Sequence, residues 1–329
     1  MAGRRKALIM VLAILAVVLI VVAGLLIAGH VARSKLAMQT PAPGKMVTSG
    51  DHHLHVYCQG KGPVTVLFEA GLNDFSVFWR NIQSLLASQT QTCSYDREGL
   101  GWSELSHNPA TLENRVNDLN SVIVAISSNR QLVLVGHSFG ALLVRAYAQR
   151  NPQNIKALVL LDPASEFMAE RINGYHDALT KAQGQFNMLS LLAATGLIAL
   201  DPSGVPSSGL SGVALTQYRA VLAFGEFFQG AAKETAQMFD NLQAMKKISA
   251  NETIKWPVIV ISRGGSEPIP GLPQDSAASL EKTWAGLQAE LVNRLGAKQL
   301  VAENCGHHVQ LCNPTLIYKT ILPLIANVE

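Results

Sequence analysis

Short apolar runs and stretches of helical spacing alternate along most of the chain. Apolar, β-branched runs predict strands at residues 53–59, 64–71, 91–96, 132–138, 157–163, 257–264 and 298–304. Apolar positions recur at helical spacing over residues 76–88, 111–128, 139–150, 276–295 and 314–326. This alternation is typical of an α/β fold, in which helices flank a mainly parallel, buried sheet.

The alternation stops between residues 163 and 254. This stretch contains helical segments such as ALTQYRAVLAFGEFF and a bend rich in glycine, proline and serine, DPSGVPSSGLSG. Strands and helices resume after it, so we expect one folded domain over residues 46–329 with a helical cap inserted at about 163–254. Phe224, Phe227, Phe228 and Met238 suggest a hydrophobic acyl or small aromatic pocket under this cap, although such residues more often form the core of a cap.

A long apolar run lies near the amino terminus. Residues 7–28 read ALIMVLAILAVVLIVVAGLLIA without a charge, and a helix of this length spans roughly 30 Å of hydrocarbon. Basic residues at positions 4–6 precede the run, so the positive-inside rule predicts a cytoplasmic segment at 1–6, a transmembrane anchor at 7–28 and an extracytoplasmic domain. Arg33 and Lys35 follow the run and weaken this asymmetry.

The alternative to an anchor is a cleaved signal peptide, which would leave a secreted domain. The apolar run is longer than the usual ~7–15 residue core of a signal peptide, and no good A-x-A site follows it. Residues 29–45, which include TPAPGK, are expected to be a polar, proline-rich linker to the folded domain.

Composition and cysteine usage agree with export. The chain has 329 residues, of which 48% are hydrophobic and 15% charged, and its net charge of +3 forms no basic run beyond the amino terminus. Nucleic acid is therefore not an expected partner. The four cysteines, Cys58, Cys93, Cys305 and Cys312, form no C-x-x-C pair and could make two disulfides in an oxidising compartment. A zinc site, for which the spacing is poor, and four reduced thiols are the alternatives.

Residues 136–140, GHSFG, interrupt an apolar strand directly before a helical stretch. In a nucleophile elbow the serine occupies a strained strand-to-helix turn, and the flanking glycines remove side chains that would collide with neighbouring backbone. Ser138 is then a nucleophile at the carboxyl edge of the sheet. The backbone amide of Phe139, at the start of the helix, would face an anion that develops beside it.

A serine hydroxyl needs a base, and the base needs an acid that orients it. His307 in ENCGHHVQLCNP follows a late strand and precedes the last helix, which makes it the favoured base, with His308 as the alternative. Asp162, at the end of the strand after the nucleophile strand, is the favoured acid. Glu267 and Asp275, in the loop after the strand 257–264, are the alternatives, and all three keep the chain order serine, acid, histidine.

Two further groups of residues bear on the site. The loop after the strand 64–71 should supply a second oxyanion donor, the amide of Leu72, because Gly71 allows close approach. His52, His53 and His55 could suggest a metal, but their position on an early strand favours solvent-facing histidines.

Taken together, these motifs resemble the α/β-hydrolase superfamily over roughly residues 47–328. The loop EAGLND, the stretch SYDREGLGWS, the elbow GHSFG and GHHVQL fall in the order and approximate spacing of that family. The resemblance implies an α/β-hydrolase fold with Ser138 as nucleophile, His307 as base and the amides of Leu72 and Phe139 as oxyanion hole. Many members carry an aspartate soon after the strand matched by 257–264, where this chain has none. Some lipases and dehalogenases use an acid after the preceding strand, where Asp162 stands.

The resemblance also bears on Asp96, Arg97 and the cysteines. In this family YDREGLGWS forms a loop beside the active site, so Asp96 and Arg97 look structural. The strand order of the family would place the strand of Cys58 beside that of Cys93, which makes a bridge plausible. A Cys305–Cys312 bridge would close an eight-residue loop around His307 and restrict its motion.

The function expected from the sequence is a membrane-anchored serine hydrolase that cleaves small-molecule, ester-type substrates through an acyl-enzyme without a cofactor or metal. An amidase, lactonase or C–C bond hydrolase would use the same triad, and a non-catalytic ligand-binding protein could keep the same fold. Dehalogenases and epoxide hydrolases need a carboxylate where this chain has Ser138.

Overall fold

The computed structural model describes residues 2–127, 130–268, 272 and 277–326. Its centre is an eight-stranded sheet of order β1-β2-β4-β3-β5-β6-β7-β8. The strands are β1 (Lys45–Ser49), β2 (His52–Gln59), β3 (Val64–Glu69), β4 (Gln91–Tyr95), β5 (Gln131–His137), β6 (Ile155–Leu161), β7 (Val258–Arg263) and β8 (Lys298–Ala302). β2 pairs antiparallel with β1 and β4, and all other neighbours are parallel. The predicted α/β fold with a mainly parallel sheet is therefore confirmed.

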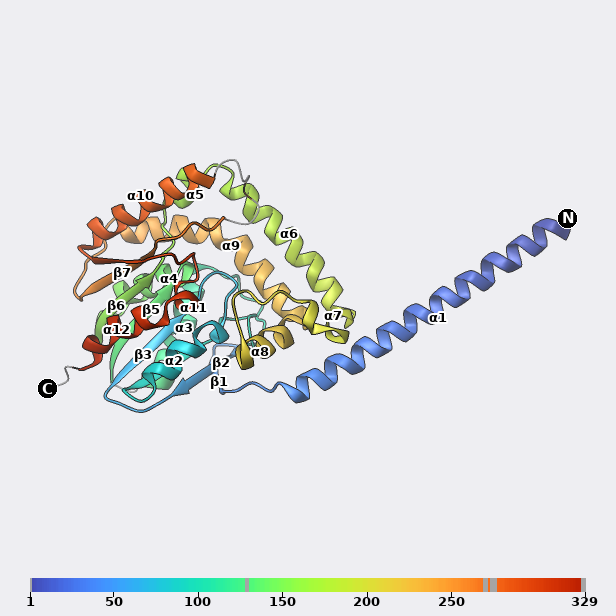
Figure 1. Ribbon diagram of the computed structural model, residues 1–329, viewed down its shortest axis with the longest axis horizontal. Coiled ribbons are helices and arrows are strands. Elements are labelled where there is room, and N and C mark those ends of the chain that lie inside the picture. The colour runs from blue at the N-terminus through green and yellow to red at the C-terminus, as the bar shows by residue number, and fades with distance from the viewer. Residues whose placement is uncertain (1, 128–129, 269–271, 273–276, 327–329) are drawn as a thin grey trace.

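Helices cover both faces of this sheet (Figure 1). One core contains α3 (Leu112–Ser127), α4 (Phe139–Arg150) and α10 (Ala277–Leu295). The other contains the helix pair η1 (Ser76–Trp79) and α2 (Arg80–Leu86), together with α12 (Pro314–Ala326). Alternate residues of β5 point into the two cores, Leu132 and Leu134 into the first and Val133 and Val135 into the second.

The segment between β6 and β7 is helical, where the sequence places the cap. It contains α5 (Met168–Arg171), α6 (Tyr175–Ala194), α7 (Leu197–Leu200), η2 (Pro202–Gly204), α8 (Gly212–Leu222) and α9 (Gly225–Ser249). The long helices α6 and α9 pack side by side along one edge of the molecule (Figure 1). Phe227 and Phe228 pack in an aromatic cluster with Phe75 and Phe78, so they form cap core.

Helix α1 (Ala2–Gln39) projects away from the domain (Figure 1). It is long and apolar enough to cross a membrane, and its most apolar window is 0% buried against the rest of the protein. The helix continues to Gln39, so the connection to β1 is shorter than the linker expected at 29–45. No proline occurs before Pro41, so nothing in HVARSKLAMQ stops the helix.

Both disulfides inferred from the resemblance are present. Cys58 and Cys93 are direct partners across β2 and β4, and Cys305 is joined to Cys312. The second bridge closes the loop that precedes and contains α11 (Val309–Cys312).

Candidate active site

Ser138 lies between β5 and α4 in a conformation that few residues other than glycine adopt. Its backbone has φ 50° and ψ −118°, which is strained for a residue with a side chain. A Cβ at Gly136 would lie 2.7 Å from the Cα of Ala141, and one at Gly140 would lie 2.4 Å from the carbonyl oxygen of Glu69. Both flanking glycines are therefore required by the close approach of backbone.

Strand β6 holds this turn in place. The amide of Ser138 donates to the carbonyl of Leu161 at 3.0 Å, and the amide of Ala164 donates to the carbonyl of Ser138 at 3.0 Å. The strain at Ser138 is thus balanced by hydrogen bonds to the end of β6 and to the loop that follows it.

Asp162 and His307 meet beside Ser138, although 145 residues separate them in the chain. His307 Nδ1 lies 2.6 Å from Asp162 Oδ2, and Trp284 Nε1 donates to Asp162 Oδ1 at 2.9 Å. Burial of Asp162 would raise its pKa, but the hydrogen bond with His307 and the charge of Arg263 hold the pKa below its usual value. An ionised Asp162 can orient the imidazole and stabilise its protonated form.

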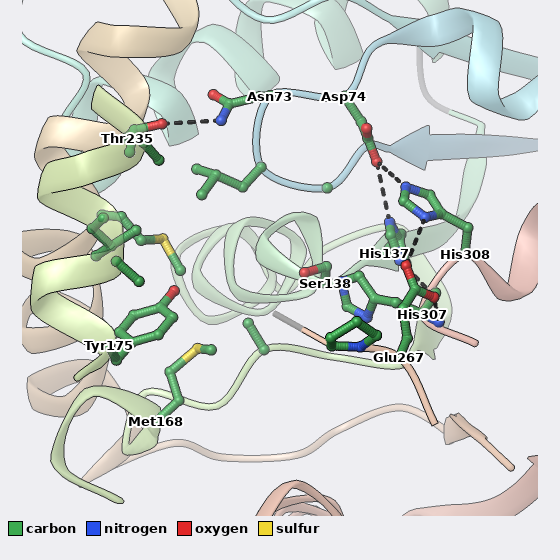
Figure 2. A pocket seen from close by; sticks show the side chains of 18 of the residues that line it. Asn73, Asp74, His137, Ser138, Met168, Tyr175, Thr235, Glu267, His307 and His308 are labelled. Carbon is green, nitrogen blue, oxygen red and sulfur yellow. Dashed lines mark hydrogen bonds and ion pairs between the residues drawn. The ribbon is translucent and has the colours of Figure 1, made fainter. Parts of the chain in front are cut away.

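Ser138 and His307 line the same cavity. Figure 2 shows both residues among the labelled side chains that line it. His307 contacts Asp162 through Nδ1, so Nε2 is the ring nitrogen that would accept the proton in the predicted triad.

Of the two alternative acids, the structure describes Glu267. Glu267 accepts a hydrogen bond from the backbone amide of His307, so it holds the main chain of the loop rather than the imidazole. Asp275 lies outside the described residues. Of Asp162 and Glu267, the structure brings Asp162 to the ring nitrogen.

The alternative base, His308, belongs to a separate cluster with Asp74 and His137. His308 Nε2 lies 3.2 Å from Asp74 Oδ2, and the ring stacks on Phe78 at a centroid distance of 5.4 Å. Burial alone would lower the pKa of His308, but the carboxylate of Asp74 raises it above its usual value. The pKa of Asp74 is depressed in turn: burial alone would raise it, but the charges and hydrogen bonds of His308 and His137 together outweigh burial.

His137 supports the loop that carries the proposed base. Its Nε2 donates to the carbonyl of His307 at 2.9 Å, and burial lowers the pKa of His137 to about 4. A neutral imidazole therefore supports the backbone of His307. The sequence analysis missed Asp74 and His137; the only signals were their positions two residues after Leu72 and one residue before Ser138.

A buried ion-pair network fixes the loop of the expected second oxyanion donor. Arg97 donates to the carbonyls of Ala70, at 2.8 Å, and Gly71. It also binds Glu234 of the cap helix α9 through Nε and Nη2, at 2.6 and 2.8 Å. The backbone amide of Asn73 donates to Glu234 Oε2 at 2.8 Å, so the cap helix and Arg97 both hold this loop.

The charges in this network stay paired. Burial alone would raise the pKa of Glu234, but the charge and hydrogen bonds of Arg97, together with the charge of Arg115 and the amide of Asn73, lower it. Leu72 lines the cavity, and Phe139 begins α4 with its side chain fully buried. Their amides remain predicted oxyanion donors.

The cavity beside Ser138 has a volume of about 320 Å³. Its apolar wall comes largely from the cap: α5 and α6 contribute Met168, Tyr175, Ala178, Leu179, Ala182 and Phe186, and α9 contributes Met238. Figure 2 shows Tyr175 and Met168 on the side of the cavity away from His308. The cavity is thus apolar under the cap and polar around His307 and His308.

The expectation of solvent-facing histidines on β2 is wrong for two of the three. His53 is exposed, but His52 and His55 are buried. His55 Nδ1 lies 2.8 Å from Asp96 Oδ2, and His52 lies 3.1 Å from Asp118 Oδ1. Asp96, directly after β4, and Asp118 of α3 supply carboxylates to these two rings in place of solvent. Across the residues that the structure describes, no group of three or more histidines, cysteines or carboxylates is placed to hold a metal ion.

Comparisons with known proteins support an α/β-hydrolase fold. A family model described as alpha/beta hydrolase fold matches residues 64–202. The uncharacterized protein YqjL of Bacillus subtilis (strain 168) is 33% identical over 106 residues, 32% of this chain and 42% of YqjL. Lipase LipV of Mycobacterium tuberculosis is 31% identical over 127 residues, 38% of this chain and 48% of LipV. The chain thus spans less than half the length of each of these two relatives.

A solved structure extends the likeness to almost the whole domain. The esterase EaEST from Exiguobacterium antarcticum superposes with a TM-score of 0.63 at 16% identity, over 86% of this chain and all of EaEST. At this identity the likeness concerns the fold alone. Fold and relatives together support a hydrolase.

Proposed function

The chain belongs to the α/β-hydrolase superfamily, and within it we propose a serine hydrolase that cleaves carboxylic esters with lipophilic acyl groups. The observation that carries this proposal is the contact between His307 and Asp162 at 2.6 Å beside a serine held at φ 50°. Strain at a buried turn is retained where it positions a reacting group.

The proposed reaction proceeds in two halves. His307 accepts the proton of Ser138 as the hydroxyl oxygen attacks the ester carbonyl, and Asp162 stabilises the imidazolium that forms. The amides of Leu72 and Phe139 bind the oxyanion. The alcohol leaves with the proton from His307, and a water molecule, activated by the same base, then hydrolyses the acyl-enzyme to release the acid.

The apolar wall of the cavity supports a lipophilic acyl group. Burial of apolar surface contributes about 0.8 kcal/mol per methylene, so each added carbon of the acyl chain should strengthen binding until the cavity is filled. An amide, lactone or C–C bond substrate would use the same triad.

We further propose that α1 is an uncleaved anchor and that the hydrolase domain lies on the extracytoplasmic side. Basic residues at positions 4–6 support a cytoplasmic amino terminus. The two disulfides support an oxidising compartment for the domain.

The test combines active-site labelling with hydrolysis of p-nitrophenyl esters of increasing acyl length. We expect a fluorophosphonate to label the wild type, and a Ser138→Ala variant to lose both labelling and hydrolysis. Ser203→Ala, an exposed serine outside the cavity, is the matched control and should behave as the wild type. A folded wild-type protein that takes up no label would refute the enzyme and favour a ligand-binding role. Equal rates for acetyl and longer acyl esters would refute the lipophilic pocket.

A further inference from the structure

The cap carries a group of large apolar side chains on its surface. Met188 is 65% exposed, Leu191 74% and Leu192 43%, all on α6. Leu197 and Leu200 of the adjacent α7 are 38% and 43% exposed. We call these five residues the cap face. Contiguous exposed apolar side chains mark sites of contact with other molecules or with membranes.

The residues of the cap face lie close together in the sequence, on two consecutive helices. Met188, Leu191 and Leu192 are spaced by three and four residues, so they share one side of α6. Another side of the same helix packs on α9. Between residues 186 and 218 the only charged side chain is Asp201, although 15% of the whole chain is charged.

The cap face lies next to the end of the apolar run of α1. Gly29 of α1 packs directly on Gly196, the residue before α7: a Cβ at Gly29 would lie 2.7 Å from the carbonyl oxygen of Thr195. Figure 1 shows α7 against α1 at this point, with the apolar part of α1 continuing beyond it. Since the apolar run ends at Ala28, α7 lies at the level where an anchor helix would leave the hydrocarbon.

We propose that the cap face inserts into the interface of the same lipid bilayer that α1 crosses. This inference rests on the proposed anchor and deepens the proposed function. The bilayer is the occupant that fits, because the contact with α1 places the cap face beside the membrane and the surrounding sequence has almost no charge to oppose insertion. The apolar segment that carries the cap face is too short to span a membrane, so a position at the level of the lipid headgroups suits it.

The arrangement has a consequence for the substrate. Tyr175, Ala178, Ala182 and Phe186 of α6 line the cavity that contains Ser138, while the cap face continues the same helix toward its carboxyl end. One helix thus connects the lipid surface with the wall of the cavity. The substrates are therefore esters that partition into the bilayer and enter the cavity from it.

Depth-dependent fluorescence tests the insertion without requiring activity. The full chain is reconstituted in phosphatidylcholine vesicles with Leu191→Cys carrying an environment-sensitive NBD label. All four native cysteines are in disulfides, so the introduced thiol is the one that reacts. Val124→Cys on α3, 67% exposed and outside the cap, is the matched control.

We expect a blue-shifted emission at position 191 that doxyl-labelled lipids quench at least twofold more than the emission at position 124. Equal emission and equal quenching at the two positions would overturn the proposal. A blue shift at position 191 without lipid quenching would also overturn it, because the label would then be covered by protein, such as a second copy of the chain.

A kinetic experiment separates this inference from the proposed function. Leu191→Glu combined with Leu197→Glu should raise the KM for a long-chain ester embedded in vesicles at least fivefold and leave hydrolysis of a short, water-soluble ester unchanged. Val124→Glu should change neither, and an unchanged KM in the double variant would overturn the proposal. If the wild type hydrolyses no ester while the label at position 191 is quenched, the cap face stands and the proposed function fails.

Discussion

Ser138 and Asp162 end neighbouring parallel strands, and both have positive φ, 50° and 37°. Strained residues at the carboxyl ends of adjacent strands bring their side chains to one edge of the sheet. The strained turn at Ser138 could be predicted from GHSFG alone, because the spacing of the glycines reflects local backbone contacts. The acid could not be settled in the same way, since Asp162 and Glu267 both keep the chain order and only tertiary packing decides which one reaches His307.

This difference gives the first prediction. Asp162→Asn should lower kcat/KM for a p-nitrophenyl ester by about 10³- to 10⁴-fold, because the neutral amide cannot stabilise the imidazolium. Glu267→Gln should retain most of the activity, since its carboxylate contacts the backbone amide of His307. Steady-state kinetics of both folded variants checks the assignment. The opposite ranking of the two variants would make Glu267 the acid.

The buried imidazole of His137 should make the folded protein less stable at acidic pH. Burial lowers the pKa of His137 to about 4, so the folded state holds the ring neutral while the unfolded chain takes up a proton below pH 6.5. The stabilisation is therefore present above pH 6.5 and is lost as the pH falls from 6.5 toward 4. Its full size is on the order of 3 kcal/mol. His308 does not account for this loss, because its raised pKa makes its contribution complete below pH 6.5.

The comparison that isolates this effect is His137→Gln, whose amide can still donate to the carbonyl of His307. Thermal unfolding followed from pH 7.5 to 4 should show a smaller decrease of the midpoint in the variant than in the wild type. Parallel curves would show that His137 does not titrate in this range.

At the scale of elements, the cap and the sheet share one ion-pair network around the loop of Leu72. Glu234 of α9 and Arg97 after β4 both bind this loop. The motif YDREGLGWS marks Arg97, but nothing in the sequence pairs it with Glu234, which is 137 positions further along the chain. The network makes the position of the cap helix part of the geometry of the active site.

We therefore expect Glu234→Gln to lower kcat at least tenfold with little change in KM, because the loop loses a charged anchor while the apolar wall of the cavity remains. Leaving Arg97 short of a buried partner should also cost about 3 kcal/mol of stability. Lys233→Gln, on the same helix and paired with Glu98, is the control and should leave kcat unchanged. An unaltered kcat in folded Glu234→Gln would reduce the network to a purely structural role.

Most elements could be predicted from periodicity, and the exceptions have physical causes. Strand β1 (Lys45–Ser49) was missed because it is a short edge strand with polar residues at three of five positions. The polar composition of residues 29–39 predicts a linker, but the absence of proline before Pro41 lets the long helix continue to Gln39. The buried state of His52 and His55 depends on carboxylates that arrive from distant parts of the chain.

At the scale of the whole molecule, the apolar helix and the disulfides both bear on which side of the membrane the domain lies. The two disulfides support the proposed extracytoplasmic location of the domain, and an uncleaved α1 with basic residues at its start would keep the domain on that side. Three basic residues precede the apolar run and two follow shortly after it. The proposed orientation therefore depends on a difference of one positive charge between the two ends of the run.

Reversing that charge difference should change two properties together, the side of the membrane on which the domain lies and the oxidation state of its cysteines. In right-side-out membrane vesicles of the expressing cell, added protease should digest the wild-type domain, and the unreduced protein should take up no alkyl groups. Replacing Arg4, Arg5 and Lys6 with glutamate should turn the domain inward for a large fraction of the chains, where it becomes protected from protease and its four cysteines become alkylatable, because a reducing compartment does not support disulfides. Mass spectrometry checks both readouts and the presence of residues 1–28. A wild-type mass that lacks these residues would identify a cleaved signal peptide, and a protected wild-type domain would contradict the proposed orientation.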